Sequence, residues 1–139
     1  MRIALFLLGL TLVLTSPASA RDYILYSRIG DVDADRVAER VVIYSSNPNP
    51  RKGKSVALAV QEKRGGQWRT VFREKSVDHE FHPENNNLAA QTGGMKTGLY
   101  IRKTDARYPD IFIVFTPNSG DFFLYRYNGS TYKLLDVGN

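Results

Sequence analysis

The chain has 139 residues and a formal net charge of +5, and it contains no cysteine. The lack of cysteine excludes a disulfide scaffold, a thiol nucleophile, a zinc site built on thiolates and a lipid anchor on an N-terminal cysteine. The positive charge favours an acidic protein, an anionic lipid headgroup or a teichoic-type polymer as a neighbour, or simply a solvated basic surface, but it indicates no reaction.

The chain begins with the pattern of a secretory signal peptide. Arg2 precedes an apolar run over residues 3–14, and Ala18 and Ala20 place small side chains where signal peptidase reads them. The run is shorter than the roughly 20 apolar residues that span a bilayer. We therefore predict a signal peptide over residues 1–20, cleaved after Ala20, and a periplasmic or secreted protein without a membrane span.

Eight short runs rich in β-branched and aromatic residues follow this leader, each bounded by Gly, Pro, Asn or Asp, as is typical of strands. They cover residues 23–26, 41–44, 56–60, 68–72, 99–101, 111–115, 122–127 and 132–137. The pattern predicts a single all-β domain over residues 21–139.

The first four predicted strands and the last four share one order of features. In both sets an acidic residue precedes the second strand, and the last two strands form a hairpin with a glycine-bearing turn, at residues 64–67 and 128–130, followed by an aromatic residue. We interpret this as a duplicated four-stranded antiparallel unit. Unit one covers residues 22–75, a connecting loop covers 76–97, and unit two covers 98–138.

An acidic loop leads into the second predicted strand. Asp31, Asp33, Asp35 and Glu39 occupy its first, third, fifth and ninth positions. Calcium takes about six to eight oxygen ligands, and alternate residues of a tight loop can direct carboxylates inward while a later carboxylate completes the shell. The four residues are therefore candidate calcium ligands. A metal-free turn capped by the aspartates fits the same residues, as does a short helix after an aspartate cap.

The acidic loop, the strand after it and the hairpin resemble the integrin-type β-propeller repeat called FG-GAP or VCBS. In that repeat such a loop joins the first two strands of a four-stranded blade, and the resemblance covers most of residues 21–139. It implies that Asp31, Asp33, Asp35 and Glu39 bind calcium. Because a propeller needs at least about four blades, two blade-like units predict an open sandwich rather than a closed propeller.

Two features depart from the repeat. Arg36 stands where the repeat normally has glycine, and a non-glycine residue in a left-handed conformation costs about 1 to 2 kcal/mol. The second unit has Arg102, Thr104 and Ala106 near the ligand positions, so no second calcium site is implied there.

Aromatic residues alternate along the last two predicted strands. Alternation places one face of the sheet in the core, and exposed aromatic side chains on the other face would suit a protein or a sugar. We predict a binding face that contains Phe123, Tyr125, Tyr127 and Tyr132.

No catalytic motif is recognised. The G-x-S-x-G pattern is missing, and the only histidines, His79 and His82, lack the spacing of a zinc-protease helix. We therefore predict an exported non-catalytic binding protein, an inhibitor or immunity-type partner of another exported protein. The alternatives are a carbohydrate or cell-wall binding module and an enzyme with an unrecognised site. Nucleic acid is not expected as a partner, because the only Arg-Gly-Gly triplet lies at a predicted hairpin turn.

Overall fold

A computed structural model describes most of the predicted domain. The described residues are 23–49, 56–74, 95–116 and 121–138. The predicted signal peptide, both histidines and nearly all of the predicted connecting loop lie outside them. The described part contains no helix with the length and hydropathy needed to cross a bilayer.

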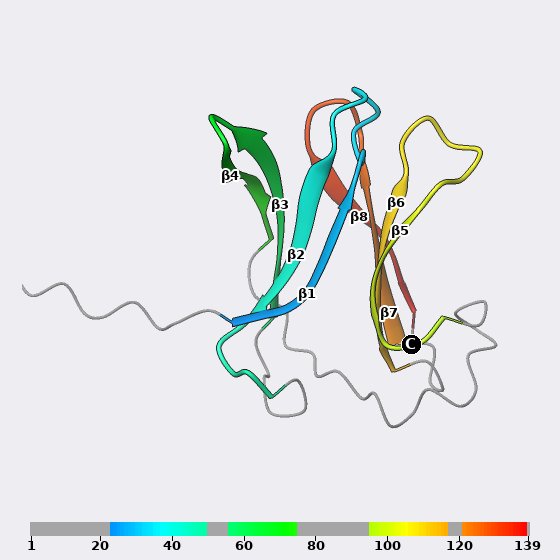
Figure 1. Cartoon of the computed structure of the whole chain (residues 1–139). Coiled ribbons are helices and arrows are strands. Elements are labelled where there is room, and N and C mark those ends of the chain that lie inside the picture. The colour runs from blue at the N-terminus through cyan, green and yellow to red at the C-terminus, as the bar shows by residue number, and fades with distance from the viewer. Residues whose placement is uncertain (1–22, 50–55, 75–94, 117–120, 139) are drawn as a thin grey trace, which may run out of the picture.

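Within these residues the chain is all-β, with two four-stranded antiparallel sheets (Figure 1). The first sheet has the order β1-β2-β3-β4 and consists of β1 (Tyr23–Gly30), β2 (Glu39–Ser45), β3 (Val56–Arg64) and β4 (Gln67–Arg73). The second has the order β5-β6-β7-β8 and consists of β5 (Gly98–Arg102), β6 (Asp110–Thr116), β7 (Asp121–Tyr127) and β8 (Tyr132–Gly138). The predicted fold class is confirmed, and all eight predicted strands are present.

Each sheet is a meander in which consecutive strands pair, so each sheet takes its strands from one half of the chain. In each sheet the last two strands are joined by a tight turn that contains glycine. Gly65 and Gly66 have φ values of 57° and 79° in the β3–β4 turn, and Gly129 has a φ of 97° in the β7–β8 turn. These are angles that favour glycine, as the sequence predicts.

One hydrophobic core lies between the two sheets. It takes β-branched and leucine side chains from the first sheet and mainly larger side chains from the second. Its fully enclosed members include Val41, Val60, Leu99, Ile111 and Phe115. The core lacks any covalent cross-link, because the chain has no cysteine. Hydrogen bonds join the strands within each sheet, and burial of apolar side chains holds the two sheets against each other.

The second sheet has the same orientation as the first, so that equivalent strand faces point the same way. Glu39 begins β2 and Asp110 begins β6, so the residues two positions later, Val41 and Phe112, are equivalent. Val41 faces the core, whereas Phe112 lies outside the core cluster and stacks on Phe122, with ring centroids 4.8 Å apart. Equivalent faces of the two sheets thus point the same way, and the sheets form an open sandwich.

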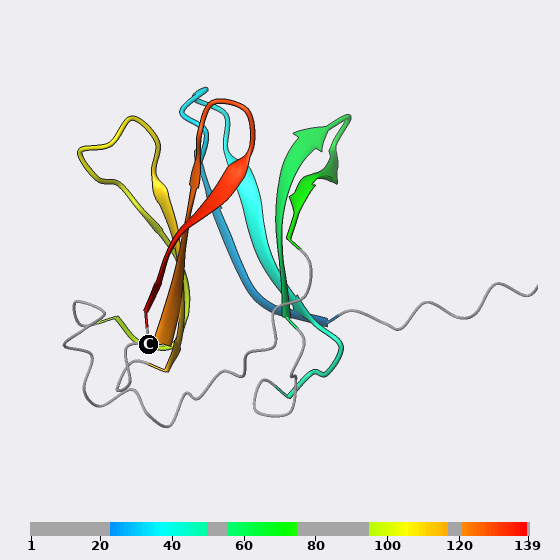
Figure 2. The same ribbon diagram turned by 180° about the vertical axis from the view of Figure 1, so that it is seen from behind.

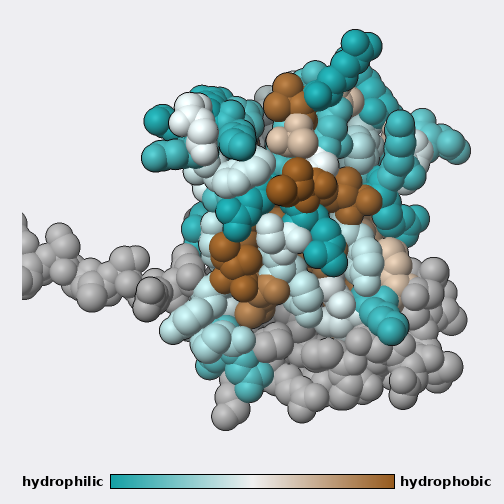
Figure 3. Space-filling view, viewed as in Figure 1, coloured by the Kyte–Doolittle hydropathy of each residue, from teal (hydrophilic) through white to brown (hydrophobic). Residues whose placement is uncertain are grey.

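Equivalent loops consequently project from the same end of the molecule. The β1–β2 loop (residues 31–38) and the β5–β6 loop (residues 103–109) both lie at the upper end in Figures 1 and 2. The face seen in Figure 3 carries separate apolar patches among hydrophilic side chains. The exposed apolar side chains of the described residues include Ile24 and Ile29 of β1 and Val37 of the β1–β2 loop. The upper end therefore combines two polar loops with the exposed apolar side chains of Ile29 and Val37, whereas Ile24 lies near the other end of β1.

Candidate functional site

Val32, the second residue of the β1–β2 loop, fixes the loop to the core. The Val32 side chain is fully buried, and the Val32 backbone N–H donates a hydrogen bond to Glu39 Oε2 at 2.8 Å. At Gly30, where β1 ends, an added Cβ would lie 3.0 Å from Ile101 Cδ1 of β5. Glycine at position 30 therefore allows Ile101 of the second sheet to approach the start of the loop. The hydrogen bond from the Val32 N–H holds the loop next to the Glu39 carboxylate.

Three of the four predicted ligands meet in this loop. Asp31, Asp33 and Glu39 each offer one carboxylate oxygen, and these oxygens all lie within 4.8 Å of one another. Glu39 is only 1% exposed. Asp31 Oδ1 is buried and has no hydrogen-bond partner in the structure. The predicted spacing thus brings a buried carboxylate and two partly buried ones together; we call Asp31, Asp33 and Glu39 the acidic cluster.

The fourth predicted ligand, Asp35, lies outside the cluster. Its Oδ1 accepts a hydrogen bond from the Val37 N–H at 2.6 Å, so its carboxylate caps the end of the loop instead. The other aspartates also bond to loop backbone: Asp33 Oδ1 accepts from the Asp35 N–H at 3.1 Å, and Asp31 Oδ2 accepts from the Arg36 N–H at 3.0 Å. Turn capping and clustering therefore coexist, and the helical alternative is wrong because residues 31–38 form an irregular loop.

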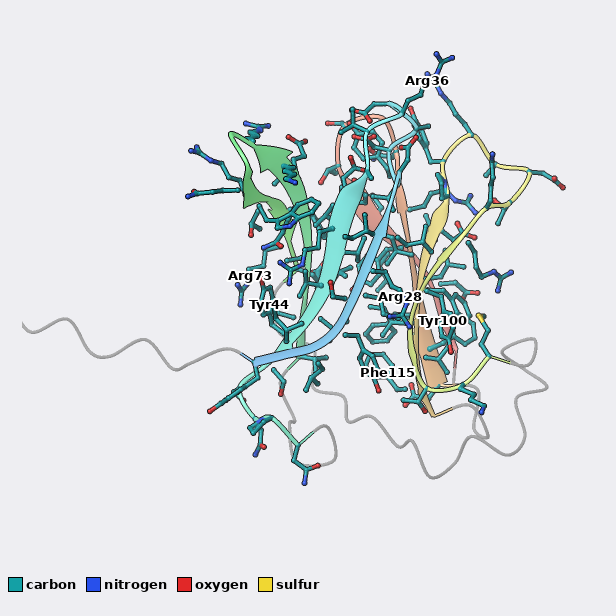
Figure 4. The ribbon with its side chains drawn as sticks, in the orientation of Figure 1. Arg28, Arg36, Tyr44, Arg73, Tyr100 and Phe115 are labelled. Atoms are coloured by element: carbon teal, nitrogen blue, oxygen red, sulfur yellow. The ribbon has the colours of Figure 1, made fainter. Side chains whose placement is uncertain are left out.

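The loop contains two non-glycine residues with left-handed backbone. Ala34 has a φ of 63° and Arg36 a φ of 72°. Arg36 therefore has a left-handed backbone at the position where the repeat that the sequence resembles normally has glycine. Its side chain points outward from the end of the molecule (Figure 4). The strain at these residues is confined to an exposed part of the loop and leaves the acidic cluster intact.

We expect Arg36→Gly to stabilise the protein by up to about 1 kcal/mol, because glycine removes a left-handed strain of about 1 to 2 kcal/mol but gains freedom in the unfolded chain. Equilibrium urea unfolding measures the change. Ala38→Gly, in the same loop and without a positive φ, is the matched control and should destabilise by up to about 1 kcal/mol. A loss of stability in Arg36→Gly equal to that of the control would show that Arg36 is not strained.

The acidic cluster raises the pKa of its own members. Burial is the main cause that brings the pKa of Glu39 to about 7, and the negative charges of Asp33, Asp35 and Asp31 add to it, while the hydrogen bond from the Val32 N–H opposes it. Burial also raises the pKa of Asp33. Within the described residues no lysine or arginine forms an ion pair with the cluster. The cluster thus concentrates negative charge that no ion pair among the described residues neutralises.

In the second unit an arginine of the same sheet offsets the charge of the equivalent buried acid. Asp110, equivalent to Glu39, is 4% exposed, and Arg126 Nε donates to Asp110 Oδ1 at 2.6 Å. Arg126 is the cross-strand partner of Asp110. In the first unit the pairing of Arg40 with Gln61, continued by one residue, places Glu62 at that position. Unit two therefore holds its buried acid with its own arginine, a pairing that sequence analysis missed because it depends on strand register.

Most residues of the predicted aromatic binding face are buried in the core. Phe123, Tyr125 and Tyr132 are 6%, 1% and 6% exposed, and Tyr127 packs against the same core. Tyr132 also reaches the first sheet, where its ring centroid lies 5.3 Å from that of Phe72. Alternation correctly places these residues on one face of the sheet, but that face is the one that the first sheet covers.

The outer faces of the two sheets carry arginine side chains over aromatic rings. The Arg73 guanidinium lies 5.2 Å from the ring centroid of Tyr44 on the first sheet (Figure 4), and that of Arg102 lies 5.2 Å from the ring centroid of Phe112 on the second. These contacts cover ring faces that a ligand would otherwise use. They leave the loop end of the molecule as the best candidate site.

Comparison of the chain with protein-family models, with curated proteins and with solved structures finds no match in any of the three.

Proposed function

We propose that the chain is an exported, non-catalytic binding protein whose β1–β2 loop takes up one calcium ion. The observation that carries this proposal is the acidic cluster, whose three carboxylates lie within 4.8 Å of one another. A bound divalent cation would offset the negative charge there, as Arg126 does for Asp110 in the second unit. The cation would also give the buried Asp31 Oδ1 the partner that it lacks.

The chemistry of the cluster favours calcium over other divalent cations. Three carboxylates, each bound through one or both oxygens, supply between about three and six of the six to eight oxygens that calcium takes, and loop carbonyls and water can supply the rest. Magnesium demands a stricter octahedral shell and keeps more of its water. Zinc sites mostly use histidine or cysteine, and the cluster has neither.

Export and partner class follow from separate observations. The leader over residues 1–20 supports export, and calcium-binding modules outside the cell work at dissociation constants of about 0.1 to 1 mM. A protein partner, as for an inhibitor or immunity-type protein, is favoured over a carbohydrate. The rings at Phe123, Tyr125 and Tyr132, on which a sugar would stack, are buried, whereas a protein can also be bound through the loops at the upper end of the molecule.

The proposal predicts a calcium-specific rise in the thermal midpoint. A ligand at one hundred times its dissociation constant adds about 2.7 kcal/mol to stability, which moves the midpoint of a domain of this size by several degrees. The protein is melted in chelator, in excess calcium and in excess magnesium. We expect a rise in calcium that magnesium does not reproduce.

Two variants test whether the rise comes from the acidic cluster. Asp33→Asn should remove it, whereas Asp105→Asn, which neutralises an exposed aspartate in the β5–β6 loop, should keep it. A calcium-induced rise that survives in Asp33→Asn, or its absence in the unmodified protein, would contradict the proposal.

A further inference from the structure

A pocket of about 360 Å³ lies between the β1–β2 and β5–β6 loops. Asp31 and Ala34 line it from the first loop, and Ile101 and Pro109 line it from the second sheet and its loop. Both loops project from the same end of the molecule (Figures 1 and 2). Ligand pockets usually have volumes of about 300 to 1,000 Å³. The volume therefore suits one or two side chains of a partner or a small ligand.

The lining of the pocket combines an apolar part with two cations. Ile101, Pro109 and Ala34 supply aliphatic surface, while Lys103 and Arg107 supply positive charge. Both cations are exposed, and neither forms an ion pair within the described part of the chain. Arg107 is held over the ring of Tyr108, with 5.2 Å between its guanidinium and the ring centroid. This combination suits a ligand with a short aliphatic stem and a carboxylate end.

The aliphatic lining favours a peptide over a sugar. None of the residues that line the pocket is aromatic, so the pocket offers no ring face on which a sugar could stack. The ring of Tyr108, next to Arg107 in the β5–β6 loop, is covered by the Arg107 guanidinium and makes an edge contact with Tyr127, with ring centroids 5.2 Å apart. The formal net charge is +5, and +4 without Arg2 of the predicted signal peptide, so the protein is complementary to an acidic partner in either form.

We propose that this pocket binds a glutamate-type side chain from an acidic segment of a protein partner, with Lys103 and Arg107 holding the carboxylate and Ile101 contacting its methylene groups. The proposal names the partner chemistry of the function proposed above and rests on it. Asp31 lines the pocket and belongs to the acidic cluster. Without a cation its charge repels an incoming carboxylate, and with calcium bound that repulsion is removed, so binding becomes tighter in calcium.

The test is a calorimetric titration of the protein with an acetylated hexapeptide of alternating glutamate and leucine. A peptide of alternating glutamine and leucine tests the need for carboxylates. The double substitution Lys103→Ser with Arg107→Ser should weaken binding at least about tenfold, since hydrogen bonds to charged groups are among the stronger ones. Lys63→Ser with Arg69→Ser removes the same charge from the exposed β3–β4 hairpin and should change affinity less than about twofold.

Four outcomes decide the proposal. Loss of peptide binding in the pocket variant alone supports it, and equal loss in both double variants contradicts it, because the attraction would then be non-specific. Pocket-dependent binding of an oligogalacturonate, but not of the peptide, also contradicts it and assigns the pocket to acidic polysaccharide. Peptide binding that requires Lys103 and Arg107 but is the same in chelator and in calcium supports the pocket and contradicts the calcium loop.

Discussion

Glu39→Gln is expected to stabilise the calcium-free protein above pH 7 by up to about 3 kcal/mol and to abolish its response to calcium. Glu39 is 1% exposed and shares its surroundings with Asp31 and Asp33. Glutamine keeps an oxygen that can accept the hydrogen bond from the Val32 N–H but removes the charge. Glu39→Gln should therefore raise the free energy of unfolding and weaken calcium binding.

The pH dependence of this effect has a definite sign. Burial, together with the negative charges of Asp33, Asp35 and Asp31, raises the pKa of Glu39 from 4.5 to about 7 in the folded protein. Between these values the folded state binds more protons than the unfolded state, so stability falls as the pH rises and levels off above about pH 7. One pKa unit corresponds to 1.36 kcal/mol, which sets the order of magnitude of the loss.

Denaturant unfolding in chelator at pH 5 and at pH 8 measures this effect. The unmodified protein should be less stable at pH 8 than Glu39→Gln, and the gap should shrink at pH 5. Asp105→Asn removes an exposed carboxylate from the β5–β6 loop and controls for net charge. If Glu39→Gln is the less stable protein at pH 8 in chelator, the Glu39 carboxylate is not repelled by its neighbours and needs no cation.

The second large effect is expected for Tyr125→Ala, which should lower the free energy of unfolding by about 3 to 5 kcal/mol, as aromatic truncations in cores do. The Tyr125 side chain is 1% exposed, and its ring makes an edge contact with Phe123, with centroids 6.5 Å apart. Burial raises the pKa of Tyr125 to about 12, with the charge of Glu74 as a lesser cause. The phenol therefore stays neutral in the core over the usual pH range.

Leu135→Ala is the comparison for this variant. Leu135 lies in β8 and is 52% exposed, so its truncation should cost less than about 1 kcal/mol. Urea unfolding of the two variants measures both losses. Similar losses for Tyr125→Ala and Leu135→Ala would mean that Tyr125 lies at the surface, as the predicted binding face requires.

The sequence predicts the strands because their signals are local. Each strand is a short β-branched or aromatic run bounded by turn residues, and the turns at Gly65, Gly66 and Gly129 need the positive φ that glycine provides. The meander adds no long-range pairing within either sheet, since every paired strand is a neighbour in sequence. Local patterns were therefore sufficient for the fold class and the strand positions.

The parts that sequence could not supply depend on which surfaces meet. Alternation shows that Phe123, Tyr125 and Tyr127 share a face, but not that the first sheet covers it. Position in the loop selects Asp35 as a ligand, yet its carboxylate bonds to the Val37 N–H. Side-chain direction in an irregular loop follows the local backbone, which residue spacing does not determine.

The β5–β6 loop likewise has features that the sequence alone does not predict. Its pocket-lining cations, Lys103 and Arg107, are ordinary surface residues in the sequence, and only the packing of the two sheets sets them beside Asp31. In the sequence Asp110, the first residue of β6, likewise gives no hint that Arg126 neutralises it. Both features join residues from different strands or loops, so they emerge only with the fold.

The most direct test of the calcium loop is a calorimetric titration of calcium into the chelator-treated protein. We predict saturable binding of about one ion per chain, because the second unit has an arginine at Arg126 beside its buried acid and no acidic cluster among its described residues. Asp31→Asn should abolish the heat of binding, and Asp105→Asn should preserve it. Binding of no ion, or binding that persists in Asp31→Asn, would contradict the assignment of the acidic cluster as the calcium site.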